Sequence, residues 1–177
     1  MASAGKRKSK ILGGGYLIFT LVGTHPQAFD RLLKKIDELI ESKKITESVI
    51  AQIGVSGYKP ENYKAKSFFS NSGMKSLIKK SSLVISHAGA GTIITALRAD
   101  KKIIVVPRLK KFGEHTNDHQ LELARALEKE GKVIAVYKIE NLGAAISAAH
   151  KFRPALGKES PLAKKLSAYL KSMEGEK

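Results

Sequence analysis

A short apolar run that leads directly into a glycine-bearing turn constrains the fold of this chain most. Residues 83–85 form the apolar run, residues 86–92 form the turn, and a helix-like stretch follows at 93–98. Gly89 and Gly91 let the backbone approach a ligand closely, and the start of a helix offers N–H groups that lack intrahelical partners. The pattern therefore predicts a buried strand, an anion-binding turn and a helix, in that order.

Strand patterns and helix patterns alternate along the chain. Apolar runs rich in β-forming residues predict strands at residues 16–22, 48–53, 66–69, 83–85, 102–106 and 133–136. Apolar residues at helical spacing predict helices at residues 29–40, 74–78, 93–98, 119–130 and 142–149. The alternation predicts an α/β fold, with a Rossmann-like open parallel sheet and helices on both faces.

Right-handed crossovers place the turns that follow parallel strands on one edge of the sheet. That edge would gather four segments: residues 23–25 after the first strand, the stretch near Phe69, the turn at 86–92 and polar residues 108–120. Because an open α/β sheet binds its ligand at such an edge, the sequence predicts a site there.

Length and composition narrow the class of protein. A chain of 177 residues is one domain by length, and the absence of cysteine excludes disulfides and thiolate metal sites. No apolar run approaches the roughly 20 residues of a membrane span, and residues 1–8 lack the apolar core of a signal peptide. These observations indicate a soluble, intracellular protein.

Half of the net charge of +16 lies in the two ends. Residues 1–10 have four Lys or Arg and no acid, and residues 151–177 have seven Lys or Arg and three Glu, so each end contributes +4. Such ends suit an anionic membrane surface or nucleic acid, and solvated tails are an equal alternative. The lack of tryptophan and of RNA-binding aromatic signatures disfavours nucleic acid as the partner of these ends.

A pattern that begins at Pro161 predicts an amphipathic helix near the C-terminal end of the sequence. Such a helix packs on its own domain or docks on a partner.

Three motifs, in order and at natural spacing, resemble the C-terminal domain of glycosyltransferase family 28. They are residues 22–24, 85–92 and 117–124, and the likeness runs from Tyr16 to Ile146. It is greatest to the small stand-alone members, the catalytic subunits of two-part UDP-sugar transferases. Those subunits act in asparagine-linked glycan assembly and in bacterial or archaeal exopolysaccharide synthesis.

The resemblance implies the C-terminal half of a GT-B fold in three parts. These would be a basic flexible leader (1–15), a nucleotide-sugar-binding domain (16–150) and a basic C-terminal segment with an amphipathic helix (151–177). The implied function is the donor-binding catalytic subunit of an inverting glycosyltransferase. It would move a sugar, GlcNAc above others, from a UDP-sugar to a lipid-diphosphate-linked acceptor. A membrane-anchored partner subunit would hold the acceptor, so we expect a peripheral location on the cytoplasmic face of the membrane.

The resemblance also implies where the donor binds. Its diphosphate would rest at the helix start on residues 90–92, and the helix dipole would take the place of a metal ion, so neither metal nor cofactor is expected. His87 would donate to a phosphate oxygen or else be satisfied within the turn. The implied donor-binding residues are Gly23, Thr24, Phe69, His87, Ala88, Gly89, Ala90, Gly91, Thr92, Thr95, Arg108, Glu114, Asp118, His119 and Gln120.

This chain departs from related transferases at the position that holds the ribose. A glutamate holds the ribose hydroxyls in those enzymes, whereas Thr95 stands at the matching position here. A threonine cannot grip two hydroxyls as a carboxylate does, so Glu114 or Glu122 is expected to compensate. Residues 118–120 match the segment that reads the sugar hydroxyls. Arg108 would oppose a diphosphate, with an exposed surface arginine as the alternative.

An inverting transferase needs a general base to deprotonate the acceptor hydroxyl. Within this chain His25 and His115 are the candidates, and the partner subunit is the other possible source. The pairs at 114–115 and 118–119 also suit metal ligation, although Pro107 and Gly113 predict a loop there and disfavour it.

Two other functions stay open. The loss of the ribose glutamate at Thr95 favours a non-catalytic nucleotide-sugar-binding module. The net charge favours a nucleic-acid-binding protein, which would leave the glycine turn and residues 113–120 without a role. A neighbouring gene for a companion α/β domain with one membrane anchor would favour the transferase.

Overall fold

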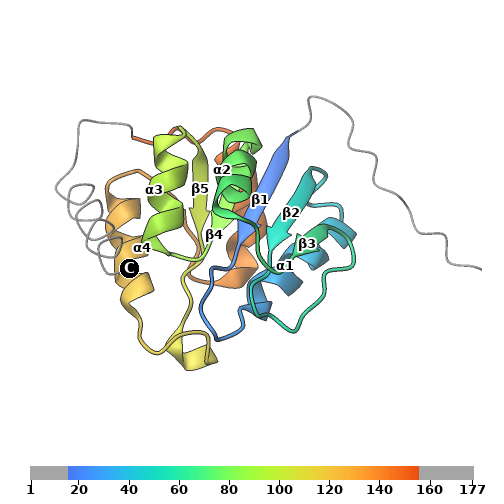
Figure 1. The fold of residues 1–177 in the computed structure, drawn as a ribbon. Coiled ribbons are helices and arrows are strands. Elements are labelled where there is room, and N and C mark those ends of the chain that lie inside the picture. The colour runs from blue at the N-terminus through green and yellow to red at the C-terminus, as the bar shows by residue number, and fades with distance from the viewer. Residues whose placement is uncertain (1–15, 156–177) are drawn as a thin grey trace, which may run out of the picture.

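Six parallel strands form one sheet in the order β3-β2-β1-β4-β5-β6 (Figure 1). The computed structural model describes residues 16–155. Its strands are β1 (Leu17–Leu21), β2 (Ser48–Gln52), β3 (Lys64–Lys66), β4 (Leu83–Ser86), β5 (Lys102–Val105) and β6 (Ile134–Ala135). The helices are α1 (Asp30–Glu41), α2 (Asn71–Lys80), α3 (Ala90–Arg98), α4 (His119–Lys129) and α5 (Leu142–Ala149), with 3-10 turns η1 (Lys110–Phe112) and η2 (Ile139–Asn141).

The predicted α/β class and Rossmann-like parallel sheet are confirmed. The predicted leader (1–15) and the amphipathic helix predicted from Pro161 lie outside the described residues, so the division into three parts stays a prediction. Within residues 16–155 no helix combines the length and apolar character that crossing a membrane requires.

The strand predicted at 66–69 is shifted toward the N-terminus in the structure. β3 ends at Lys66, and Phe68 and Phe69 lie in the loop that follows. The N–H of Phe69 donates to the side-chain Oε1 of Gln52 at 3.1 Å rather than to a backbone carbonyl of β2. Ser70 then caps α2, and its hydroxyl accepts a hydrogen bond from the N–H of Gly73 at 3.1 Å. The prediction for this segment was therefore wrong in its boundary, because the pairing with β2 ends at Gln52 and Lys66.

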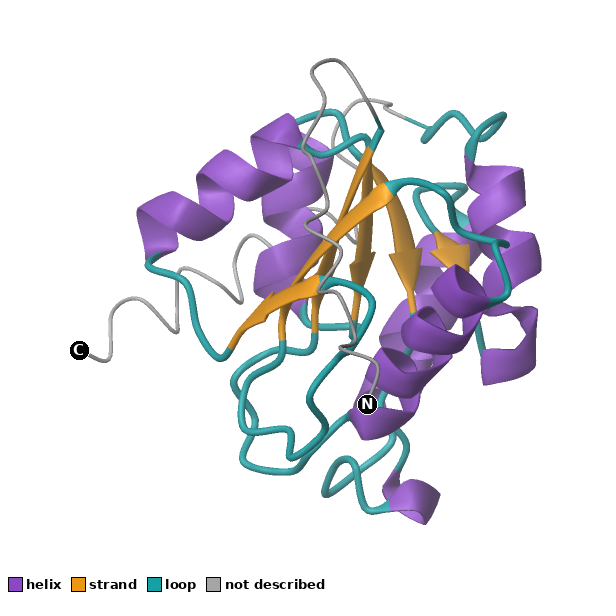
Figure 2. Ribbon diagram, turned by 90° about the vertical axis from the view of Figure 1, so that its right-hand side faces the viewer, coloured by secondary structure: helices purple, strands orange, loops and turns teal. Residues whose placement is uncertain are grey.

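Helices cover both faces of the sheet (Figure 2), which explains why the central strands are apolar throughout. Successive residues of β1 point to opposite faces. Ile18 packs with Leu33 of α1 and Ile146 of α5, whereas Phe19 packs in the cluster that contains Ile93 of α3. The two cores hold the strands rigidly, and so they also hold the loops at the carboxyl ends of the strands.

The strand order reverses between β1 and β4. The chain passes from β1 outward to β2 and β3, then returns to β4 on the other side of β1. At such a switch point the loops after the two central strands diverge, and open α/β sheets bind ligands in the crevice between them. Here those loops begin at Val22 and His87, so the switch point lies beside the glycine turn.

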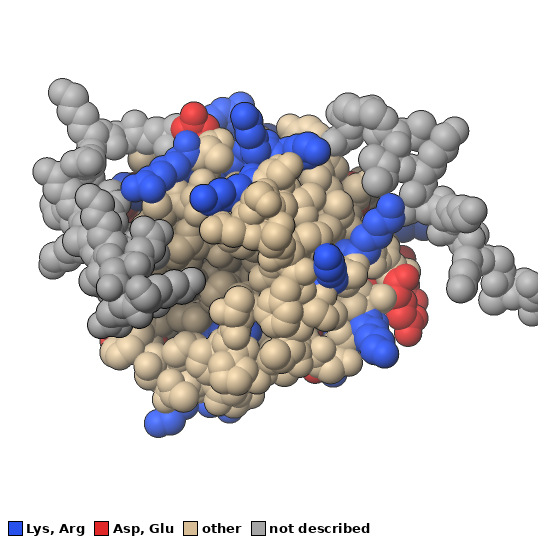
Figure 3. All heavy atoms as spheres, in the orientation of Figure 1, with Lys and Arg blue, Asp and Glu red and all other residues tan. Residues whose placement is uncertain are grey.

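Basic side chains gather at the opposite, amino edge of the sheet. Figure 3 shows Lys and Arg along the upper edge of the molecule, over the ends of α2 and α3. Lys79 and Lys80 lie in the last turn of α2, Arg98 ends α3 and Lys129 ends α4. Cations at these positions complement the negative ends of the helix dipoles. Part of the positive charge is therefore explained by favourable interaction with the helix dipoles, and it lies away from the switch point.

Candidate functional site

The glycine turn between β4 and α3 lies at the switch point. Gly89 precedes α3 with extended backbone (φ −85°, ψ 123°), and the helix begins at Ala90. The first N–H groups of the helix, those of Ala90, Gly91 and Thr92, have no intrahelical partner and face the carboxyl edge. These three residues are partly exposed, and the first turn contains no acidic residue. The helix start can therefore bind an anion.

The ring of His87 fills the space between two glycines. A Cβ on Gly23 would lie 2.6 Å from His87 Nε2, and a Cβ on Gly89 would overlap the same atom. On its other side, His87 Nδ1 lies 3.4 Å from the carbonyl oxygen of Leu21. A carbonyl only accepts, so this contact places the proton on Nδ1 and leaves Nε2 without one in the neutral ring. The geometry favours a histidine satisfied within the turn over a phosphate donor.

Stability is expected to depend on pH through His87. Burial, and secondarily the nearby Arg108 cation, lowers the pKa of His87 to about 4, from 6.5 in an unfolded chain. The unfolded state therefore binds more protons between these values, so stability falls as the pH falls from 6.5 toward 4. We expect the urea midpoint to drop between pH 7 and pH 5, and the drop to shrink in His87→Asn. A drop of equal size in both proteins would contradict the assignment.

The two candidate bases lie against each other. The rings of His25 and His115 are stacked, with centroids 4.5 Å apart and planes 28° apart, although they come from the loops after β1 and β5. Nδ1 of each accepts a backbone N–H at 3.3 Å, from Gln27 and Asn117 respectively. Neutral rings held in this way have the proton on Nε2, which makes them hydrogen-bond donors to a ligand oxygen. Burial, then His115 and Arg108, lowers the pKa of His25, which keeps that ring neutral at pH 7.

Arg108 is buried and ties these two loops together. Its guanidinium donates to the carbonyl of Val22 at 2.6 and 3.2 Å, to that of Gln27 at 2.5 Å and to that of Glu114 at 2.9 Å. Only 1% of the residue is exposed, and burial lowers its pKa to about 10. The side chain points into the protein, which favours a positioning role over contact with a diphosphate and excludes the exposed arginine.

Glu114 is committed to the same scaffold. Its carboxylate accepts two hydrogen bonds from Arg31 of α1, at 2.8 and 2.9 Å, and one from the N–H of Leu109 at 3.1 Å. The carboxylate is nearly buried, so it is poorly placed to replace the missing ribose glutamate. Sequence reasoning missed Arg31, because its position on the polar side of α1 looks like that of any surface cation.

The segment before α4 divides into scaffold and exposed side chains. Asp118 Oδ1 accepts the first N–H of η1 at 3.0 Å, and Gln120 Oε1 accepts the N–H of Arg108 at 3.1 Å. His119 is largely exposed, and its Nδ1 lies 3.5 Å from Glu122 on the next turn. Of the three residues predicted to bind the sugar hydroxyls, Asp118 and His119 are exposed and Gln120 is half-buried. Only His119 among them makes no side-chain hydrogen bond to the backbone of the loop after β5.

The other predicted residues lie along the same edge or one turn into α3. Thr95 Oγ1 donates to the carbonyl of Gly91 at 2.8 Å, so its hydroxyl proton is used within the helix. Thr24 is exposed, and Ala88 is buried and offers only its backbone. The Phe69 ring packs edge to face against the Phe19 ring of β1, with centroids 5.9 Å apart.

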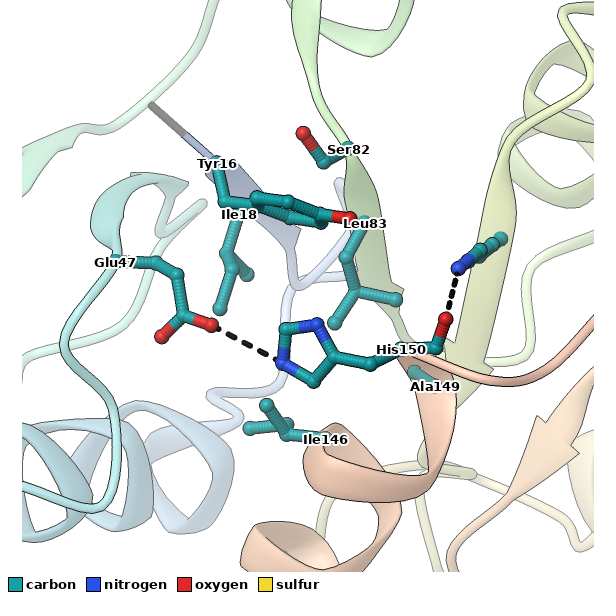
Figure 4. Close-up of a pocket in the computed structure, with 9 residues that line it drawn as sticks. Tyr16, Ile18, Glu47, Ser82, Leu83, Ile146, Ala149 and His150 are labelled. Carbon is teal, nitrogen blue, oxygen red and sulfur yellow. Dashed lines mark hydrogen bonds and ion pairs between the residues drawn. The ribbon is translucent and has the colours of Figure 1, made fainter. Parts of the chain in front are cut away.

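A small pocket at the amino edge does not belong to this site (Figure 4). His150 Nε2 lies 3.2 Å from Glu47 Oε1, and Lys102 Nζ donates to the His150 carbonyl at 2.7 Å. The Tyr16 ring packs on the imidazole with centroids 5.3 Å apart. These contacts tie the end of α5 to the starts of the strands. No cluster of three or more potential metal ligands exists among residues 16–155, and metal-free binding stays a prediction.

A comparison with protein families identifies the family to which this domain belongs. The model of the glycosyltransferase family 28 C-terminal domain matches residues 17–172, which is most of the chain. The chain belongs to this family. The switch point, the glycine turn and the stacked histidines all lie within the matched residues.

Individual proteins that are similar to this family 28 domain align with part of its sequence. The UDP-N-acetylglucosamine transferase subunit ALG13 of Homo sapiens is 37% identical over 123 residues, which is 64% of this chain and 10% of that protein. The subunit of the same name from Cryptococcus neoformans is 41% identical over 91 residues, 50% of this chain and 43% of that protein. The chain thus matches less than half the length of these relatives.

Solved structures confirm the fold of the family 28 domain. The solution structure of ALG13 has a TM-score of 0.57 at 21% identity and covers 86% of this chain and 94% of that one. The glycosyltransferase of kitacinnamycin has a TM-score of 0.60 at 15% identity, over 99% of this chain and 44% of that one. The likeness to somewhat under half of a larger glycosyltransferase fits the predicted half of a GT-B fold.

Proposed function

We propose that this family 28 domain is the donor-binding half of an inverting glycosyltransferase. It takes a UDP-sugar, GlcNAc above others, and transfers the sugar to a lipid-diphosphate-linked acceptor held by a membrane-anchored partner subunit. The observation that carries the proposal is the start of α3 at the switch point between β1 and β4, with unpaired N–H groups and no acid in its first turn. Similarity to subunits named for UDP-N-acetylglucosamine transfer supports the choice of donor.

The chemistry follows from the charge that develops during transfer. As the bond to the sugar breaks, negative charge grows on the leaving UDP, and preorganised N–H donors stabilise it without having to reorganise. Ala90, Gly91 and Thr92 supply these donors at the positive end of the helix dipole. The Nε2–H groups of His25 and His115, whose Nδ1 atoms accept backbone N–H groups, add two further donors at the same edge. With these protons on Nε2, the general base comes from the partner subunit.

Metal-free calorimetric titration with UDP, UDP-GlcNAc, UDP-Glc and UDP-Gal tests the proposal, using Gly91→Asp as the informative variant. The added carboxylate lies in the first turn of α3 and repels a diphosphate, while an acid at this position suits the helix dipole. Circular dichroism of the variant checks that it is folded. We expect UDP-GlcNAc to bind most tightly without magnesium, and Gly91→Asp to weaken binding at least tenfold, or about 1.4 kcal/mol.

The matched control is Gly57→Asp, which adds the same charge where a Cβ meets nothing within 4 Å. It should bind the donor like the unchanged protein. Equal losses of donor affinity in both variants would show that net charge alone causes the effect. That result would contradict a donor site at the start of α3. If the isolated chain binds no donor, the titration is repeated with the companion subunit, and continued absence of binding refutes the proposal.

A non-catalytic nucleotide-sugar-binding module is the second candidate. The Thr95 hydroxyl donates within its own helix, so only its lone pairs remain for a ribose hydroxyl. This candidate predicts donor binding with no sugar transfer when the companion subunit and a lipid-diphosphate acceptor are both present.

A further inference from the structure

The η1 turn carries an exposed aromatic ring beside the candidate site. Phe112 is 54% exposed, and its neighbours Lys110 and Lys111 are exposed as well. The turn projects from the carboxyl edge, as the yellow segment at the bottom of Figure 1 and the short helix at the bottom of Figure 2. The most exposed large apolar side chain of the described residues thus directly follows two exposed lysines.

The turn is anchored, so the exposure of the ring is built into the fold. The N–H of Phe112 donates to the Leu109 carbonyl at 3.1 Å, and the N–H of Gly113 donates to that of Lys110 at 2.9 Å. At its base the Glu114 carboxylate accepts the N–H of Leu109 at 3.1 Å. A single exposed apolar residue is ordinary on a protein surface. An apolar side chain that a hydrogen-bonded turn holds in an exposed position, beside the candidate site, indicates more strongly that it contacts another molecule.

Cations surround the ring. Lys111 Nζ and the Arg31 guanidinium each lie 4.9 Å from the centroid of the Phe112 ring. Three acids face the turn. Asp118 accepts the N–H of Lys110, Glu114 is paired with Arg31, and Asp30 lines the hollow beside Phe112. An aromatic ring with lysines at its border suits the boundary between lipid headgroups and acyl chains, where the ring is buried and the ammonium groups meet phosphates.

We propose that η1 contacts the headgroup layer of an anionic phospholipid bilayer. Phe112 enters the interface, and Lys110 and Lys111 pair with lipid phosphates. The turn leaves the same sheet edge as the start of α3, so this contact turns the donor site toward the membrane. The proposal builds on the proposed function, because a lipid-linked acceptor must reach that edge.

The test uses the absence of tryptophan from the full sequence. In Phe112→Trp the new indole is the sole tryptophan and reports on its own surroundings. With vesicles of phosphatidylcholine and phosphatidylglycerol we expect a blue-shifted emission and quenching by brominated lipid. Vesicles of phosphatidylcholine alone should give a much smaller response. Adding Lys110→Glu and Lys111→Glu should weaken partitioning at least tenfold, since each lysine near an anionic surface contributes about fivefold.

The matched control is Phe68→Trp, at a side chain that is 44% exposed in the loop after β3. Its emission should stay that of an indole in water. Unchanged emission of Phe112→Trp with anionic vesicles overturns the proposal, as does an equal shift in the control, which would mean unspecific adsorption. A shift caused only by the companion subunit without lipid also overturns it and assigns η1 to a protein interface. The calorimetric titration with UDP-sugars contains no vesicles. A failure of the proposed function in that titration can therefore be distinguished from a failure of the membrane contact in this test.

Discussion

Replacing Arg108 with methionine should cost about 3 kcal/mol of unfolding free energy, because three carbonyl oxygens, two of them in buried hydrogen bonds, lose their donor. Those carbonyls belong to Val22, Gln27 and Glu114, and the guanidinium reaches them at 2.5 to 3.2 Å. Methionine matches much of the volume and keeps the apolar contacts of the stem, so the loss reports mainly on hydrogen bonds. Urea unfolding followed by circular dichroism at pH 7 measures it.

Arg98→Met is the control, since Arg98 is exposed at the end of α3. We expect a change within about 0.5 kcal/mol there. Arg108→Met should also raise the pKa of His87 and of His25, because the Arg108 cation lowers both. A loss below 1 kcal/mol, with unchanged histidine titration by NMR, would mean that Arg108 does not hold the loops.

Gly23→Ala should destabilise the protein by more than 2 kcal/mol through two separate effects. Gly23 has φ +83°, a conformation that costs an L-residue roughly 1–2 kcal/mol. Its new Cβ would also lie 2.6 Å from the His87 ring, which is held against the Leu21 carbonyl. Displacing that ring disturbs the loops at the switch point, so the affinity for the proposed UDP-sugar donor should fall together with stability.

Gly113→Ala separates the two effects. Gly113 has a similar φ of +68°, but a Cβ there meets nothing within 4 Å. We expect it to cost only the conformational part, about 1 kcal/mol. Equal losses of unfolding free energy in the two variants would show that the His87 ring moves aside easily and is not a fixed part of the turn.

Much of the architecture could be predicted because it depends on local patterns. A run such as 83–85 followed by two nearby glycines and a helix start has few other ways to fold, and α1 and α5 follow from apolar spacing alone. The boundary of β3 could not be predicted in the same way. The apolar pair at 68–69 looks like a strand end, but the N–H of Phe69 donates to the Gln52 side chain, and only the structure shows that pairing with β2 has already ended.

The sequence by itself determined the alternation of strands and helices, the parallel sheet and the position of the helix start after the glycine turn, because periodicity and glycine act over a few residues. Only the tertiary structure decided which side chains meet at the switch point. His25 stacks on His115 and Arg31 pairs with Glu114, in each case across a long stretch of chain. A buried arginine such as Arg108 and an exposed one look the same in a sequence. Their difference arises when crossovers bring distant carbonyl oxygens around the guanidinium, and that arrangement belongs to the whole fold.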